Sequence, residues 1–177
     1  AFSRAAVGAL RTLKGHTRYQ PPPVLVGAAR TIDGLTVGLT DAARDLVAAF
    51  WPGPLTLLCH AQPTLDWDLG ESGGTVAVRM PLHPVALELL RQTGPMAVTG
   101  AGAPRSAVGS GGSQPQSCAE VRSAFGDDVR VYLDCGFLPA AAVSSVVDVT
   151  GEHPTLLRLG ALDDATLRDV VPDLVQA

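Results

Sequence analysis

Hydrophobic and polar positions follow two different periods along the chain, and together they predict alternating helices and strands. Apolar and alanine positions that recur at helical spacing indicate amphipathic helices. Short runs rich in β-branched residues indicate strands instead. Helices are expected at residues 2–13, 42–50, 84–93, 117–125 and 162–171. Strands are expected at residues 24–26, 55–61, 75–80, 95–98, 129–134, 144–149 and 155–159.

Cap residues support several of these helix ends. His83 precedes a proline, which is favoured at the first helical position, and Gly94 ends the same helix. Asp41 is the expected N-cap of the second helix, which the breakers in the sequence "WPGP" then stop. The last helix has two candidate caps, Asp163 and Asp164.

The order of the elements predicts a single α/β domain that spans residues 1–177. Strands that alternate with helices are typical of this class, and we expect at least six strands in a mixed sheet. The sequence shows no internal repeat and no linker typical of a domain boundary. With 177 residues, the chain is long enough for one sizeable core and short for two domains.

Composition favours a globular protein and argues against several other classes. Hydrophobic residues make up 46% of the chain, but no apolar run approaches the roughly 18 residues of a membrane span. The first residues also lack the long apolar core of a secretory signal. An odd number of cysteines without close spacing argues against disulfides or a zinc site and favours a cytosolic protein. These cysteines are Cys59, Cys118 and Cys135.

The charge of the chain limits its partners. A net charge of −4, from 13 Lys+Arg and 17 Asp+Glu, argues against general nucleic-acid binding. Basic residues nevertheless crowd the first 30 residues, where they form either a solvated helix face or part of a small basic pocket. Lys14 and Arg18 follow the first predicted helix and precede a strand. Two cations at such a junction either grip a triphosphate or remain solvated.

Two strand ends are candidates for ligand binding. Arg79 closes the strand "VAVRM", and ligands of open α/β sheets collect at the carboxyl ends of strands. An arginine there either clamps a carboxylate or phosphate or satisfies a nearby carbonyl or acid. Thr99 opens the glycine-rich loop that follows "PMAV", where backbone N–H groups can approach an anion. This loop matches neither a Walker A motif nor a dinucleotide fingerprint, so a plain connection is the stronger interpretation.

Other common catalytic arrangements find little support. Ser144 and Ser145 begin a predicted strand without a nearby base, so a nucleophilic serine is not expected. The four histidines show no spacing typical of metal ligands, and no pair of carboxylates suits acid–base catalysis. We therefore assign no catalytic residue and no protein-bound metal.

Several segments, in this order, resemble the threonylcarbamoyl-AMP synthase family, whose domain is of the YrdC type. The resemblance runs from about Phe2 to Val171, and its most specific parts are "FWPGPLTL" and "VAVRMPLHP". It also includes "LKGHTR", "GPMAVT" and "VVDVTGEHPTLLRLG". The resemblance implies a twisted α/β sheet with flanking helices and a concave, basic ligand cavity. It further implies a nucleotidyltransferase that converts ATP, bicarbonate and L-threonine into threonylcarbamoyl-AMP and pyrophosphate for t6A modification of tRNA.

The resemblance also implies roles for individual residues. Two groups correspond to positions that the family uses for its substrates, and Mg²⁺ is expected to accompany ATP. The expected ATP contacts are Lys14, Arg18 and Arg158, and the expected threonine contacts are Arg79, Thr99 and Ser144.

The sequence departs from the family pattern at several of these positions. The family's Lys-x-Arg is Lys14-Gly15-His16 here, "LRPG" is "LRLG", and the Thr-Ser-Ala-Asn loop is Thr99-Gly100-Ala101-Gly102. The following stretch, which includes "GSGGSQPQ", looks a few residues longer than usual. The family's Pro-Thr-x-Thr-Val-Tyr-Gly segment is absent, so the chain is expected to be N-terminally incomplete relative to the family. The Thr99–Gly102 loop thus lacks the serine hydroxyl and the asparagine amide of the family's loop. Loss of these two hydrogen bonds to charged groups would weaken nucleotide binding by roughly 3–6 kcal/mol.

Three functions remain open on the sequence alone. The first is threonylcarbamoyl-AMP synthesis, and the second is a non-catalytic binding or partner module of the same fold. The third is carbamoyl transfer to another acceptor. A cytoplasmic monomer or homodimer is expected, with an RNA contact possible at the basic cavity and with no membrane partner.

Overall fold

The computed structural model describes residues 1–102, 115–139 and 142–177. Its centre is a mixed sheet in which the strands follow the order β4-β1-β3-β2-β5-β6-β7. The pairs β1/β3, β2/β5 and β6/β7 are parallel, whereas β1/β4, β2/β3 and β5/β6 are antiparallel. The strands are β1 (Val24–Leu25), β2 (Leu55–His60), β3 (Thr75–Arg79), β4 (Met96–Ala97), β5 (Ser145–Asp148), β6 (Thr155–Arg158) and β7 (Val175–Gln176).

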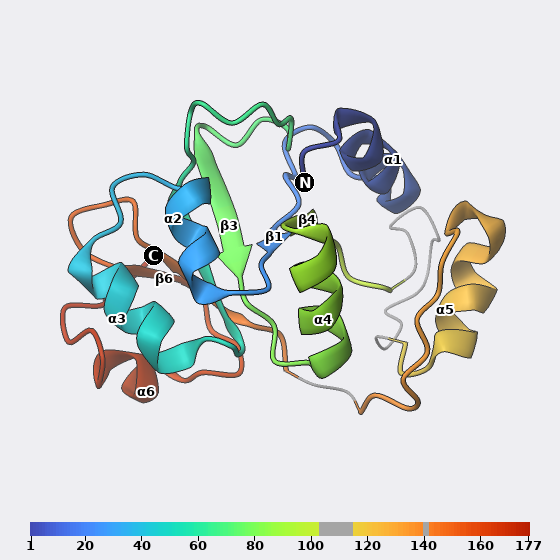
Figure 1. Ribbon diagram of the computed structural model, residues 1–177. Helices are drawn as coiled ribbons and strands as arrows, with labels where there is room; N and C mark the ends of the chain where they lie inside the picture. The colour runs from blue at the N-terminus through green and yellow to red at the C-terminus, as the bar shows by residue number, and fades with distance from the viewer. Residues whose placement is uncertain (103–114, 140–141) are drawn as a thin grey trace.

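Six α-helices and two short 3-10 turns are described around this sheet (Figure 1). Helices α1 and α5 lie at one end of the molecule, and α3 and α6 lie at the other. The helices are α1 (Arg4–Lys14), α2 (Ile32–Leu35), α3 (Asp41–Phe50), α4 (Pro84–Thr93), α5 (Cys118–Phe125) and α6 (Asp164–Arg168). The 3-10 turns are Ala29–Thr31 and Gly126–Asp128. The predicted α/β class with a mixed sheet and flanking helices is confirmed.

The helix ends show which side chains stop the backbone from fraying. Gly94 ends α4 as predicted, and His83 occupies the N-cap position, although its ring makes no capping hydrogen bond. Asp163, rather than its neighbour, caps α6 by accepting a bond of 2.7 Å from the Thr166 amide. The prediction for α3 was wrong by one residue, because the hydroxyl of Thr40 accepts the bond from the third helical amide.

One predicted strand is absent from the described structure. Residues 129–134 form no ladder, although their alternating branched residues favour extended backbone. Val131 and Leu133 remain 71% and 55% exposed, so no second sheet layer buries their side chains. Local preference for a strand has no effect here because no neighbouring strand supplies hydrogen-bond partners.

The core lies mainly on both faces of the central strands. The side chains of Leu55, Leu57 and Val78 are fully buried, as are Leu46 of α3 and Leu167 of α6. This packing fixes β2 and β3 and, with them, the strand ends that hold the candidate site.

A close helix–strand contact places α4 next to the sheet. A Cβ at Gly27, just after β1, would come within 3.0 Å of backbone atoms of Leu90 and Arg91. Contacts this short are tighter than nine in ten real Cβ contacts, so the residue without a side chain allows α4 to pack closely on this end of β1.

Candidate active site

Four strands bring polar side chains to the same edge of the sheet. Because β2 runs antiparallel to β3 and parallel to β5, the end of β3 lies beside the beginnings of β2 and β5. Strand β6 is antiparallel to β5, so its end lies at this edge too. Arg79, Thr56, Ser144 and Arg158 therefore meet there, and we call these four residues the arginine cluster.

Ser144 is the centre of the arginine cluster. Arg158 donates from Nε to the Ser144 carbonyl and from Nη2 to its hydroxyl, both at 3.0 Å. The Ser144 hydroxyl also lies 2.9 Å from the hydroxyl of Thr56. Both hydroxyl-bearing residues are buried. Ser144 thus orients the guanidinium of Arg158.

Arg79 uses only part of its guanidinium within the described structure. Its Nε donates to the Gly53 carbonyl at 2.9 Å, and the amide of Gly53 donates back to Met80 at 2.9 Å. Arginine carries five N–H donors, so its terminal nitrogens are left for another acceptor. Burial, followed by the positive charge of Arg158, lowers the pKa of Arg79.

The hydrogen-bond partners of the two clustered arginines are carbonyl and hydroxyl groups. In the described residues, Arg79 and Arg158 form no ion pair with a carboxylate. Two guanidinium groups that lie near each other without an acid create a site for an anion. The arginines that do pair with acids are Arg4, Arg18, Arg44, Arg91 and Arg168.

The edge is held in place from the side of β5 and β6. A Cβ on Gly160 would lie 2.4 Å from the Val143 carbonyl oxygen, so this position in the loop after β6 accommodates only a residue without a side chain. The fully buried Ser145 donates to the Leu162 carbonyl at 2.7 Å and accepts from the amides of Gly160 and Leu162. These contacts fix the backbone that positions Ser144.

Lys14 lies in a second cluster, at the end of α1. Its ammonium donates to the carbonyl of Gly102 and lies 5.4 Å from the centre of the Phe125 ring on α5. Lys14 is 6% exposed, and burial lowers the pKa of its ammonium. The contact brings α1, α5 and the Thr99–Gly102 loop together, and we call this group the lysine cluster.

Thr99 belongs near the lysine cluster rather than the arginine cluster. The amide of Val98 bonds to the Pro23 carbonyl at 3.0 Å, so the chain leaves β4 beside the beginning of β1. Along the strand direction, Thr99 lies about three residues before the level of Arg79. Across the sheet, β4 is two strands away from β3, which carries Arg79. At roughly 3.3 Å per residue and 4.8 Å per strand, the two backbones are about 14 Å apart.

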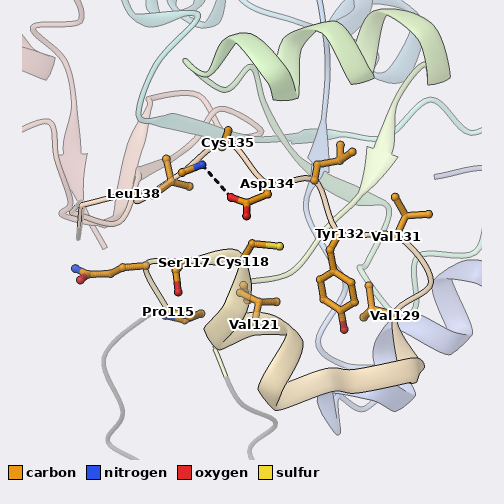
Figure 2. A pocket seen from close by; sticks show the side chains of 14 residues that line it. Pro115, Ser117, Cys118, Val121, Val129, Val131, Tyr132, Asp134, Cys135 and Leu138 are labelled. Carbon is orange, nitrogen blue, oxygen red and sulfur yellow. Dashed lines mark hydrogen bonds between the residues drawn. The ribbon is translucent and has the colours of Figure 1, made fainter.

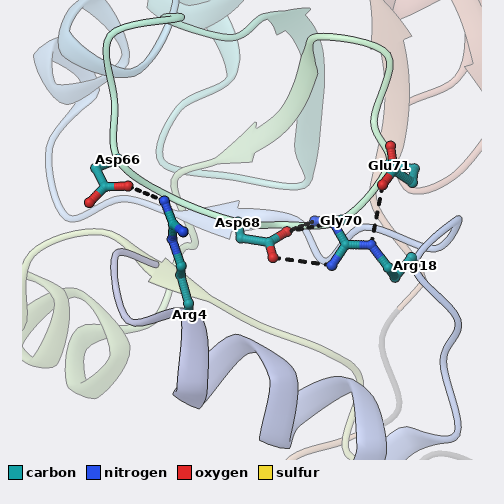
Figure 3. A network of polar contacts seen from close by, with 6 residues as sticks. All are labelled: Arg4, Arg18, Asp66, Asp68, Gly70 and Glu71. Atoms are coloured by element: carbon teal, nitrogen blue, oxygen red, sulfur yellow. Dashed lines mark hydrogen bonds and ion pairs between the residues drawn. The ribbon is translucent and has the colours of Figure 1, made fainter.

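Arg18 is held by carboxylates in a network of polar contacts (Figure 3). Its terminal nitrogens bond both oxygens of Asp68 at 3.1 Å, and its Nε bonds Glu71 at 3.2 Å. The hydrogen bonds of Asp68, and then those of Glu71, raise the pKa of Arg18. A triphosphate would have to displace two acids to reach this side chain, so an ATP contact here stays a prediction.

The structure thus gathers three of the six predicted site residues and adds groups that the sequence did not single out. Thr56 and the Gly53 carbonyl were missed, because their role depends on which strands are neighbours. Most of the long stretch with "GSGGSQPQ" lies outside the described residues. Within the described residues, no group of three or more His, Cys, Asp or Glu side chains is placed to hold a metal ion. No described helix is long and apolar enough to cross a membrane.

Proteins of known sequence identify the relatives of this chain. A relative from Mycobacterium tuberculosis, provisionally named threonylcarbamoyl-AMP synthase, is 47% identical over 171 residues, which are 97% of this chain and 76% of that protein. The threonylcarbamoyl-AMP synthase of Pyrococcus abyssi is 29% identical over 175 residues, or 98% of this chain and 50% of that protein.

Solved structures and a family model agree with these relatives. Sua5 of P. abyssi, complexed with L-threonine, matches with a TM-score of 0.87 and 28% identity over 100% of this chain and 51% of that chain. YciO of Escherichia coli shares the fold, with a TM-score of 0.71 and 19% identity over 93% of this chain and 77% of that chain. The Sua5/YciO/YrdC family model, described as "Telomere recombination", matches residues 1–160. The chain therefore belongs to the Sua5/YciO/YrdC family.

Proposed function

We propose that this chain makes threonylcarbamoyl-AMP from ATP, bicarbonate and L-threonine, with release of pyrophosphate. The arginine cluster is the observation that supports this function most, because it offers two guanidinium groups to one anionic ligand. The names of the relatives and the threonine complex of P. abyssi Sua5 supply the substrate chemistry. The product would serve t6A modification of tRNA.

The arginine cluster suits the threonine end of the reaction. The free donors of Arg79 can bind the threonine carboxylate in a bidentate manner, with the Ser144 hydroxyl beside it. Arg158, fixed by its two bonds to Ser144, would stabilise negative charge on the carbamoyl oxygen or the α-phosphate. The chemistry requires carbamate formation on the threonine amine and attack of a carbamate oxygen on the α-phosphorus. Pyrophosphate then leaves without a protein nucleophile.

The lysine cluster would bind the phosphates of the nucleotide. Lys14 supplies a buried cation, and the Thr99–Gly102 loop supplies backbone amides beside it. Binding would require the ammonium to exchange its Gly102 carbonyl for a phosphate oxygen. Mg²⁺ would arrive with ATP and be held mainly by phosphate oxygens, as is usual for this ion. Thr99 then lies nearer to the nucleotide than to a threonine ligand bound by Arg79.

Pyrophosphate release tests this function directly. We expect release from ATP with Mg²⁺ only when both L-threonine and bicarbonate are present. Release without threonine would instead indicate carbamoyl transfer to another acceptor. If neither pyrophosphate release nor ATP binding by calorimetry is observed, the non-catalytic module is the correct function for this chain, and the proposal is wrong. Gly102, which stands where the family has an asparagine, is the feature that favours the non-catalytic module.

Replacement of Lys14 by Met tests the lysine cluster. Methionine keeps an unbranched apolar stem but removes the charge, so ATP affinity should fall by about 10-fold or more, since a hydrogen bond to a charged group contributes about 1.5–3 kcal/mol. The measurement is calorimetric titration with ATP and Mg²⁺. Arg4→Met is the matched control on the same helix, because Arg4 pairs with the exposed Asp66. Equal ATP affinity of Lys14→Met and the wild type would remove Lys14 from the nucleotide site.

A further inference from the structure

A cysteine and a histidine from separate segments meet near the amino end of α4. The Cys135 sulfur lies 3.7 Å from Nε2 of His83, and 52 residues separate the two along the chain. Cys135 is exposed to solvent. His83 occupies the N-cap position of α4 without a capping bond, so its ring is free to face the sulfur. Neither residue belongs to the arginine or the lysine cluster.

Cys135 is also one of the residues that line a cavity beside α5. The cavity has a volume of about 290 Å³ and lies between α5 and residues 129–138 (Figure 2). Its wall includes Cys135 and Cys118, together with the apolar side chains of Val121, Val131 and Leu138. The Leu138 amide donates to the Gln116 carbonyl at 2.8 Å, which joins the two sides of the cavity.

We propose that Cys135 is an oxidation-sensitive nucleophilic thiol, with His83 as its proton acceptor and a peroxide as its substrate. The proton of the thiol moves to Nε2, for which the neutral imidazole must carry its own proton on Nδ1. The sulfur then attacks one peroxide oxygen, the O–O bond breaks, and Cys135 becomes a sulfenic acid. The departing hydroxide takes the proton from His83 and leaves as water. The sulfur is oxidised by two electrons and the peroxide is reduced by two.

The other two cysteines provide internal controls. Cys59 is 1% exposed, and burial, followed by the charge of Asp148, raises the pKa of its thiol to about 12. It therefore stays protonated and shielded. Cys118 lines the same cavity and is partly exposed, but no hydrogen bond to a histidine is described for it. Reactivity should fall in the order Cys135, Cys118, Cys59, because the thiolate is the reactive form and access limits the rest.

Competitive thiol labelling of the full chain tests the proposal. The protein is treated with hydrogen peroxide in the presence of dimedone, which traps sulfenic acids, and separately with iodoacetamide. Peptide mass spectrometry then gives the rate at each cysteine. We expect Cys135 to react about 10-fold faster than Cys118 with both reagents, because a positioned base accelerates such a step.

Substitution of the histidine separates its role from simple exposure. His83→Gln should lower the Cys135 rate about 10-fold and leave the Cys118 rate unchanged, while Cys118→Ser should leave the Cys135 rate unchanged. Thermal melting confirms that each variant is folded. Equal rates at Cys135 and Cys118 in the wild type, or an unchanged Cys135 rate in folded His83→Gln, would overturn the proposal.

Discussion

Replacement of Arg79 by Met is expected to lower kcat/KM for L-threonine by about 100-fold. The change removes the donors that would bind the threonine carboxylate, at a cost of about 3 kcal/mol for a charged pair of hydrogen bonds. The fold should persist, because the wild-type side chain gives one bond to Gly53 and lies near the like charge of Arg158. Steady-state pyrophosphate release at varied threonine concentration measures the effect.

Two further variants control this result. Arg44→Met removes an exposed arginine that pairs with Asp33 at 2.9 Å, and it should leave kcat/KM unchanged. Arg79→Lys keeps the charge but loses the planar fork, so it should recover only part of the activity. If Arg79→Met retained the wild-type kcat/KM for threonine, the arginine cluster would not be the threonine site.

Replacement of Ser145 by Ala is expected to destabilise the protein by about 3 kcal/mol. The hydroxyl makes three hydrogen bonds, with the Leu162 carbonyl and with the amides of Gly160 and Leu162. Each buried polar group left without a partner costs about 1–3 kcal/mol, and some relaxation reduces their sum. Urea unfolding followed by circular dichroism measures the free energy of unfolding.

The matched control for this change is Ser123→Ala. Ser123 is exposed on α5, so its substitution should alter the free energy of unfolding by no more than about 0.5 kcal/mol. Because Ser145 fixes the backbone next to Ser144, the Ala variant should also bind threonine more weakly. A loss of stability below about 1 kcal/mol would mean that the Ser145 hydroxyl does not hold the loop after β6 in place.

The sequence predicted the fold well where periodicity and caps acted together. Helix α4 has an apolar stripe, an N-terminal proline and Gly94 at its end, and the structure has these bounds. Helix α2 spans only Ile32–Leu35, and β7 only Val175–Gln176, so neither is long enough to show a period. Residues 129–134 have the pattern of a strand, but pairing depends on neighbours that a local pattern does not specify.

The candidate site was predictable only in part, for a related reason. Arg79 stands at the end of a recognisable strand, so its position at the sheet edge followed from the sequence. Ser144 and Arg158 were expected to be ligands only by resemblance, and their mutual bonds depend on the pairing of β5 with β6. No sequence pattern pointed to Thr56, because its place in the arginine cluster depends on the antiparallel pairing of β2 with β3.

Detection of the product with isotopically labelled bicarbonate tests the central claim most directly. The chain is incubated with ATP, Mg²⁺, L-threonine and the labelled bicarbonate. The adenylates are then separated, and their masses are measured by mass spectrometry. We predict threonylcarbamoyl-AMP that contains the label, and its loss in the Arg79→Met and Arg158→Met variants. An adenylate that lacks threonine, or labelled product in undiminished amount from both variants, would contradict the assignment of the arginine cluster as the site of this reaction.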